Sequence, residues 1–99
     1  MKGVIENLNK AFENRIRLGI MSVLMVNEKV DFNTLKEMLN ITDGNLASHA
    51  GALEKLKYIE VQKQFIGKKP NTTYQATETG KRAFNDHLKA LELLINQGK

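Results

Sequence analysis

Polar side chains suited to DNA contact gather on one face of a predicted helix that begins at Asp43. Asn45, Ser48 and Lys55 share this face, and His49 lies at the edge of the apolar stripe on the opposite side. The candidate DNA contacts of this helix are these four residues and Asp43 in its first turn. An Asn amide can pair with two hydrogen-bonding groups of an adenine edge, and Ser and Lys can contact bases or phosphates in a major groove. The pattern predicts a helix that contacts DNA, but the polar face of any surface helix has the same composition.

Basic side chains concentrate in a second place, around Lys63, Lys68 and Lys69. The chain has a formal net charge of +4, and residues 60–82 hold five basic against two acidic side chains, so three of the four excess charges lie there. Lysines on a projecting loop can bind the phosphates beside an occupied groove. The alternative is a soluble turn in which the lysines have no ligand.

Other chemistry has little support in the sequence. His49 and His87 are the two histidines, neither has a partner at the spacing of a helical zinc site, and the chain has no cysteine. There is no glycine-rich phosphate loop and no nucleophile motif. Arg15 and Arg17 are set aside as DNA contacts because Glu13 balances them and their helix could face a partner chain. We therefore expect no enzyme activity, no metal and no cofactor.

The elements that must position these residues follow from the apolar spacing. Apolar residues recur at helical steps over about residues 4–26, where Gly19 leaves open either two helices or one helix whose backbone is closely approached at that point. Residues 30–32 alternate like a short strand. Asn33 is the expected N-cap of a short second helix that Asn40 closes, and Thr42 with Asp43 begins a third helix ending near residue 57. Two helices joined by so short a turn are typical of a helix-turn-helix.

The third helix is expected to bury one face, and a hairpin and a last helix follow it. Its inward residues are predicted to be Leu46, Ala50, Leu53 and Leu56. Beyond Tyr58 the period changes to two, so that Ile59, Val61 and Phe65 could share one face of a strand. A turn rich in Gly, Lys and Pro and a second strand over residues 72–76 complete the hairpin. Thr77 is the expected cap of the last helix, whose apolar residues continue until Gly98.

The two ends of the chain carry more apolar surface than a core of this size can cover. With 99 residues the chain fits one domain, residues 1–99. Residues from about 1–14 and 85–99 are therefore predicted to pack against the same segments of a second copy. The residues expected in this dimer interface are Val4, Ile5, Leu8, Phe12, Leu88, Leu91, Leu94 and Ile95. A ligand pocket between these helices is a weaker alternative.

Several segments together resemble the winged helix-turn-helix transcriptional regulators of the MarR and ArsR type, in particular their short single-domain branch. The resemblance covers roughly residues 15–84 and rests on four segments: RIRLGIM at 15–21, FNTLKEML at 32–39, TDGNLASH at 42–49 leading into LEKLKYI at 53–59, and TYQATETGK at 73–81. It implies an α+β, mainly helical winged-helix fold with long terminal helices that dimerise. The cysteines of metal-sensing ArsR-type proteins are absent, and so is the extra length in which larger MarR-type proteins form an effector pocket.

The expected function is that of a homodimeric transcriptional regulator binding specific double-stranded DNA. The resemblance places a recognition helix at about 43–57 in the major groove and a wing at about 66–72 on the phosphate backbone. The alternative is a winged-helix module that binds proteins and not DNA. The N-terminus lacks the apolar run of a signal peptide, and no stretch is apolar enough to span a membrane, so a cytoplasmic protein with no membrane partner is expected. An effector ligand cannot be named from these residues.

Overall fold

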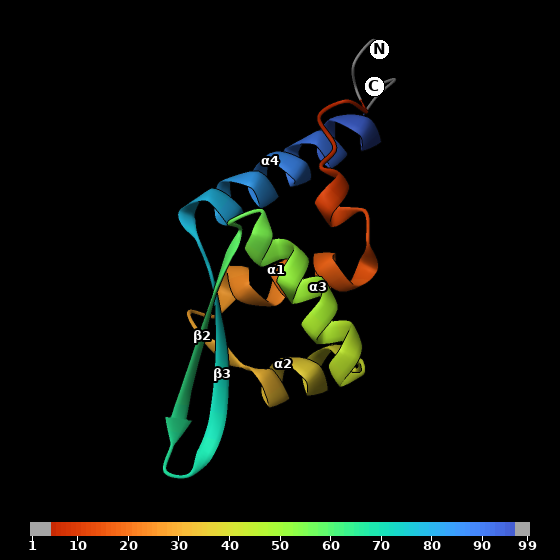
Figure 1. Cartoon of the computed structure of the whole chain (residues 1–99). Helices are drawn as coiled ribbons and strands as arrows, with labels where there is room; N and C mark the ends of the chain where they lie inside the picture. The colour runs from red at the N-terminus through yellow and green to blue at the C-terminus, as the bar shows by residue number, and fades with distance from the viewer. Residues whose placement is uncertain (1–4, 97–99) are drawn as a thin grey trace.

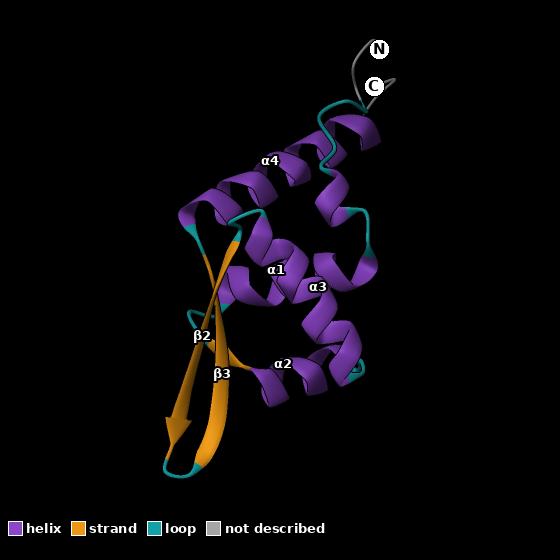
Figure 2. Cartoon of the chain, in the orientation of Figure 1, coloured by secondary structure: helices purple, strands orange, loops and turns teal. Residues whose placement is uncertain are grey.

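The computed structural model describes residues 5–96, which form a mainly helical domain with a projecting β-hairpin (Figures 1 and 2). In chain order the elements are the 3-10 helix η1 (Lys10–Phe12), α1 (Arg15–Val26), β1 (Val30–Asp31), α2 (Phe32–Leu39), α3 (Asp43–Lys55), β2 (Ile59–Ile66), β3 (Lys69–Ala76) and α4 (Glu78–Ile95). The arrangement confirms the predicted winged helix-turn-helix, in which the hairpin β2–β3 is the wing and α3 is in the place of the recognition helix.

The helix predicted over residues 4–26 is interrupted, but by two asparagines and not at Gly19, which lies within α1 and is closely approached by Leu39. Asn9 accepts a hydrogen bond from the backbone of Ala11 and begins η1. Asn14 accepts from the N–H groups of Ile16 and Arg17, which makes it the N-cap of α1. Apolar spacing continues through this region, but a capping side chain requires extended backbone at its own position, so the helix cannot run through it.

The boundaries of the helix-turn-helix differ slightly from the prediction. Asp31, not Asn33, is the N-cap of α2, since its carboxylate accepts from the Thr34 N–H at 2.8 Å. Asn40 closes α2 as expected, in the left-handed conformation at φ 53°. Thr42 caps α3 as expected, but α3 ends at Lys55 and not near residue 57. The backbone turns out of the helix at residue 57, which has φ 64°.

The wing is part of an antiparallel sheet in the order β1-β3-β2. Along the hairpin, Ile59 is opposite Ala76 at the base and Ile66 is opposite Lys69 at the tip. The connecting turn consists of Gly67 and Lys68, and the φ of Gly67 is +64°, which a residue without Cβ adopts at little cost. Lys69 therefore belongs to a strand, although the sequence pattern placed it in the loop.

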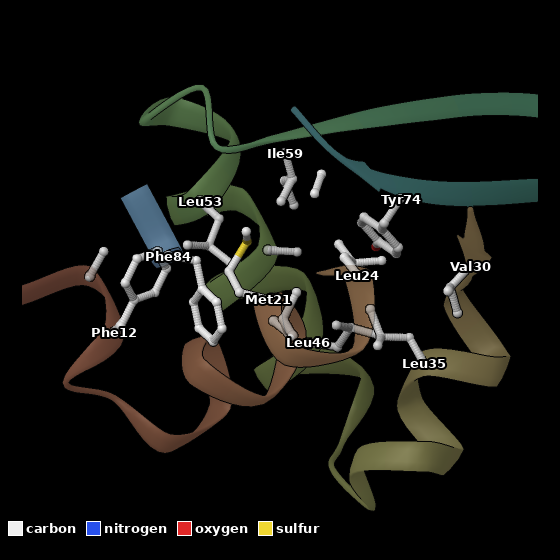
Figure 3. Close-up of a cluster of buried hydrophobic side chains, with 14 residues drawn as sticks. Phe12, Met21, Leu24, Val30, Leu35, Leu46, Leu53, Ile59, Tyr74 and Phe84 are labelled. Carbon is white, nitrogen blue, oxygen red and sulfur yellow. The ribbon is translucent and has the colours of Figure 1, made fainter. Parts of the chain in front are cut away.

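The core lies where α1, α2, α3, the base of the sheet and the start of α4 meet (Figure 3). Leu46, Ala50 and Leu53 of α3 are buried as predicted. Leu56 is 48% exposed, which corrects its expected inward position: α3 has ended before it, so the helical spacing no longer applies. Phe65 is 74% exposed, although it was predicted to share a strand face with Ile59. The reason is that β2 extends beyond the helices that cover Ile59.

The last helix, α4, packs on the core from its first turn, and its buried residues continue as far as Ala90. Thr77 caps it through the Gly80 N–H, as predicted, and Phe84 is buried in the core. Its second half extends away from the helix-turn-helix, with residues 5–9 running beside it (Figure 1). Within residues 5–96, no helix is both long and apolar enough to span a membrane.

Candidate nucleic-acid interface

The exposed face of α3 is held outward by the burial of the opposite face. Leu46 and Leu53 are fully buried against α1 and the sheet, which fixes the rotation of the helix about its own axis. Asn45, Ser48 and Lys55 are all exposed on the other side. Ser48 and Lys55 are two helical turns apart, about 10 Å along the axis, so these side chains line the helix rather than cluster.

Two glycines leave the backbone of α3 accessible on this face. A Cβ added at Gly51 would meet no atom within 4 Å, so the space above the helix at this position is open. The same is true at Gly44 in the first turn. A partner surface such as a groove floor could therefore approach the α3 backbone closely at both positions.

Asp43 begins α3 but is already paired within the chain. Its carboxylate lies 2.8 Å from the Lys36 ammonium of α2, and this contact raises the pKa of Lys36, first through the hydrogen bond and then through the charge of Asp43. The carboxylate remains 71% exposed. The pair links the two helices across the turn and reduces the negative charge at the start of α3, so Asp43 has a positioning contact in addition to its predicted place at the interface.

His49 is held by an arginine that the sequence reasoning had set aside. Arg17 of α1 points its Nη1 at His49 Nδ1 at 3.1 Å and donates from Nε to the Ala11 carbonyl at 2.7 Å. A guanidinium can only donate, so Nδ1 accepts and the ring proton is on Nε2. Arg17 thus joins η1 to the recognition helix. Because this contact depends on how α1 crosses α3, and the partners are 32 positions apart in the sequence, no local sequence signal could have revealed it.

The wing places its lysines at increasing distance from α3. Lys63 lines a hollow of about 250 Å³ together with Ala47 and Gly51 of α3, so it lies beside the recognition helix. Lys68 and Lys69 are exposed at the tip, beyond this hollow (Figure 1). The structure thus brings Lys63 next to the α3 residues and leaves the other two lysines for a more distant contact.

The lining of the same hollow also includes an acidic side chain. Glu54 lines it and also borders the surface around Ile59 and Glu60 at the base of the wing. Burial, and next the charge of Glu54, raise the pKa of Tyr74, whose ring lies between the wing and the helices. An anionic ligand in the hollow would therefore be attracted by Lys63 and repelled by Glu54.

The residues predicted for the dimer interface divide into three groups. Ile5, Leu88 and Ile95 are exposed, with 66%, 43% and 74% of their surface accessible. A second group is half-buried and comprises Leu8, Leu91 and Leu94. Phe12 is only 2% exposed, which corrects its expected place at an interface: it packs on Tyr58, Phe84 and His87 of its own chain. Val4 lies outside the described residues.

Metal binding finds no support in the part of the chain that the structure describes. Residues 5–96 contain no group of three His, Asp or Glu side chains arranged to hold a metal ion. His87 is buried and its Nδ1 accepts from the Asn9 N–H at 3.0 Å, so one ring nitrogen is already engaged within the fold.

Comparison with known proteins identifies the fold and its relatives. Residues 16–95 match the family model of a winged helix DNA-binding domain. An uncharacterized protein of Methanocaldococcus jannaschii is 37% identical over 79 residues, which are 80% of this chain and 86% of that protein. A transcriptional regulator homologue from Pyrococcus horikoshii has a similar structure with a TM-score of 0.86 and 30% identity, covering 97% of this chain and 96% of that one.

More distant structures share the fold alone. NadR, solved in complex with 4-hydroxyphenylacetate, superposes with a TM-score of 0.72 at 19% identity, over 97% of this chain and 67% of that one. The ytfH protein of Salmonella typhimurium gives 0.71 at 19% identity, over 88% of this chain and 78% of that one.

Proposed function

The chain belongs to the winged helix DNA-binding domain family, and from this premise we propose that it is a transcriptional regulator that binds specific double-stranded DNA. The Pyrococcus horikoshii protein, similar over nearly the whole of both chains, is a transcriptional regulator homologue. Family and relative both support a DNA-binding protein without enzyme activity. In the proposed complex α3 occupies the major groove and the wing contacts the phosphate backbone.

The observation that carries this proposal is the exposed face of α3 beside the lysine-bearing wing. Asn45 and Ser48 can donate and accept hydrogen bonds at base edges, and His49 offers an Nε2–H whose direction Arg17 helps to fix. Lys63 is next to this face, where a phosphate strand bordering the groove would run. Base contacts from α3 would supply the specificity, and the lysines would supply affinity that falls with salt.

We extend the proposal to a homodimer built from the ends of a single-domain chain. The support is that the large apolar side chains Ile5, Leu88, Leu93 and Ile95 are exposed, with Leu88 and Ile95 two turns apart on one face of α4. Two copies joined there would present two α3 helices to a DNA site with two-fold symmetry. Sedimentation velocity should show a dimer for the parent and a folded monomer for Leu88→Ser/Ile95→Ser. A parent that sediments as a monomer at high concentration would contradict the proposed homodimer.

The test of DNA binding is a fluorescence-anisotropy titration of duplex DNA over a salt series. We compare the parent with Lys68→Ala/Lys69→Ala and with the matched control Lys10→Ala/Lys89→Ala, which removes the same charge from exposed positions on η1 and α4. Each lost phosphate contact lowers the slope of log affinity against log salt by about 0.9. We expect the wing variant to lower it by about 2 for each bound chain, and so by about twice that for a dimer with both wings on the DNA, and the control to leave it nearly unchanged.

Either of two results would contradict the proposal. Folded parent protein that binds no duplex at low salt would favour the protein-binding alternative for this fold. Equal slopes for the wing variant and the control would remove the wing from the DNA interface.

A further inference from the structure

Arg17 holds a positive charge beside the recognition helix without an acidic partner in the described residues. Its side chain is half-buried, and it donates to the Ala11 carbonyl at 2.7 Å and to His49 Nδ1 at 3.1 Å. Neither of the ion pairs found within residues 5–96 includes Arg17, so Glu13 does not neutralise the guanidinium. Charges removed from water are normally paired. Arg17 is therefore available to a negatively charged ligand.

Arg17 and His49 together present hydrogen-bond donors and no acceptor. A guanidinium has more N–H groups than the two bonds of Arg17 use, and it has no lone pair to offer. His49 Nδ1 accepts from Arg17, so the neutral ring keeps a single donor, Nε2–H. A ligand that both side chains share must accept hydrogen bonds, and the charge of Arg17 favours an anion.

The two side chains meet on the flank of α3 that faces away from the wing. Ala47 and Gly51 line the hollow between α3 and the wing. His49 is two residues from each of them, which is about 160° around the helix axis at about 100° per residue. Ser48 falls between the two flanks, on the exposed face. Figure 1 agrees, since the wing and the residues of η1 that contact Arg17 are on opposite sides of α3.

A helix in a major groove has a phosphate strand on each flank. The groove is about 12 Å wide, and a helix with its side chains is about 10 to 12 Å across, so the flanking side chains meet the two strands. The proposed function places Lys63 at the strand on the wing side. The other strand then runs past His49 and Arg17, and its phosphates are anions of the kind that these two side chains suit.

We propose that Arg17 and the Nε2–H of His49 together bind one phosphate of the DNA strand on the side of α3 opposite the wing. The contact rests on the proposed function and extends it to a residue of α1. Arg17 supplies charge and also positions His49, because the other ring tautomer would turn a lone pair toward the phosphate and be repelled. The bond to the Ala11 carbonyl holds the guanidinium in place before DNA arrives, which lowers the entropy cost of the contact.

Fluorescence anisotropy over a salt series measures the charge that Arg17 contributes. Labelled duplex DNA of mixed sequence is titrated with the parent, with Arg17→Gln and with the matched control Arg82→Gln, which removes an exposed arginine from α4. Each lost phosphate contact lowers the slope of log affinity against log salt by about 0.9. We expect that decrease for each bound chain of Arg17→Gln, and the slope of the parent for Arg82→Gln. Circular dichroism melting verifies that the variants are folded.

Two substitutions of His49 separate hydrogen bonding from packing. His49→Phe keeps an aromatic ring but neither accepts from Arg17 nor donates to a phosphate, so it should lower the affinity about tenfold, the scale of one hydrogen bond to a charged group. A Gln amide accepts with its oxygen and donates with its nitrogen, so His49→Gln should bind nearly as tightly as the parent. If the ring only filled space, Phe would be the better replacement, and that order of affinities would overturn the proposal.

Nuclear magnetic resonance of the parent tests the same contact without a substitution. Long-range proton–nitrogen spectra at about pH 8, where free imidazole is neutral, report which nitrogen of each histidine ring carries the proton. His87 is an internal control, since it is buried and its Nδ1 accepts from the Asn9 N–H. We expect the Nε2–H tautomer for both histidines and, when duplex DNA is added, a shift of the Nε2 signal for His49 but not for His87.

Failure of this inference is distinct from failure of the proposed function. A slope for Arg17→Gln equal to that of the parent, an Nδ1–H tautomer of His49, or a His49 Nε2 signal that DNA leaves unmoved would overturn the phosphate contact. Steep salt dependence of the parent in the same titration would still support the proposed function. If the folded parent binds no duplex at low salt, the proposed function fails and the contact fails with it.

Discussion

Gly80 should tolerate no side chain, because it lies against the backbone that ends the recognition helix. A Cβ built at Gly80 would be 2.0 Å from the carbonyl oxygen of Tyr58 and 2.8 Å from its carbon. The same oxygen accepts a hydrogen bond from the Thr77 N–H at 3.0 Å, and the Thr77 hydroxyl donates to the Lys57 carbonyl at 2.7 Å. The base of the wing, the exit from α3 and the start of α4 thus meet at one point.

The cost of Gly80→Ala can be estimated from these contacts. The colliding atoms belong to backbone, so relief requires α4 to move by about 1 Å relative to Tyr58, a strain that costs about 1 to 3 kcal/mol in packed interiors. Loss of the hydrogen bond from Thr77 adds about 1 kcal/mol, and the helix propensity of Ala returns up to about 1 kcal/mol. The free energy of unfolding should therefore fall by about 2 kcal/mol, which lowers the melting temperature by about 10 °C in a domain of this size.

Urea denaturation at fixed protein concentration measures the change, since dimerisation would make stability depend on concentration. Gly51→Ala is the matched control, because a Cβ there meets no atom within 4 Å and the substitution should stabilise α3 by up to about 1 kcal/mol. A Gly80→Ala protein as stable as the parent would refute the close packing of α4 on Tyr58.

Two helix caps give further predictions. The hydrogen bond from the Thr34 N–H holds the pKa of Asp31 below its usual 3.8, so the stability that its carboxylate supplies is complete above pH 3.8 and is lost as pH falls through the lower folded value. In Asp31→Asn the amide caps the helix at every pH, so only the parent loses stability in acid. Urea midpoints measured at about pH 6 and about pH 2.5 should therefore show that the advantage of the parent over Asp31→Asn shrinks at the lower pH. The same difference at both pH values would contradict this. Thr42→Ala removes the acceptor of the Asn45 N–H at 3.1 Å and should cost about 1 kcal/mol and weaken DNA binding; unchanged melting and anisotropy curves would exclude that role.

The helix-turn-helix and the wing could be predicted because their signals are local. The buried stripe of Leu46, Ala50 and Leu53 has the helical period, and Thr42 and Thr77 are caps that need only the next three residues. The turn of the hairpin contains a glycine where positive φ is required. In each case the residues that determine the structure are neighbours in the sequence.

What could not be predicted depends on packing between distant segments. The pairing of Arg17 with His49 exists only because α1 crosses α3 at that point, whereas the charge count set the arginine aside as balanced by Glu13. Phe65 follows the period of its strand, but the periodic pattern does not say where the covering helices end. Phe12 belongs to an apolar stripe typical of a dimerising helix, whereas the break at Asn14 turns its ring into the core of its own chain.

Asn9 connects α4 to the link between α3 and the wing through two hydrogen bonds. Asn9 donates from its backbone to His87 Nδ1 and from its side chain to the Tyr58 hydroxyl, both at 3.0 Å. His87 is in α4 and Tyr58 is in the link between α3 and the wing, and the Phe12 ring packs on both. A dimer formed through α4 and residues 5–9 would therefore hold each recognition helix at a fixed position relative to the two-fold axis. The spacing of the two DNA half-sites then follows from the fold of one chain, and only a duplex with that spacing can engage both helices.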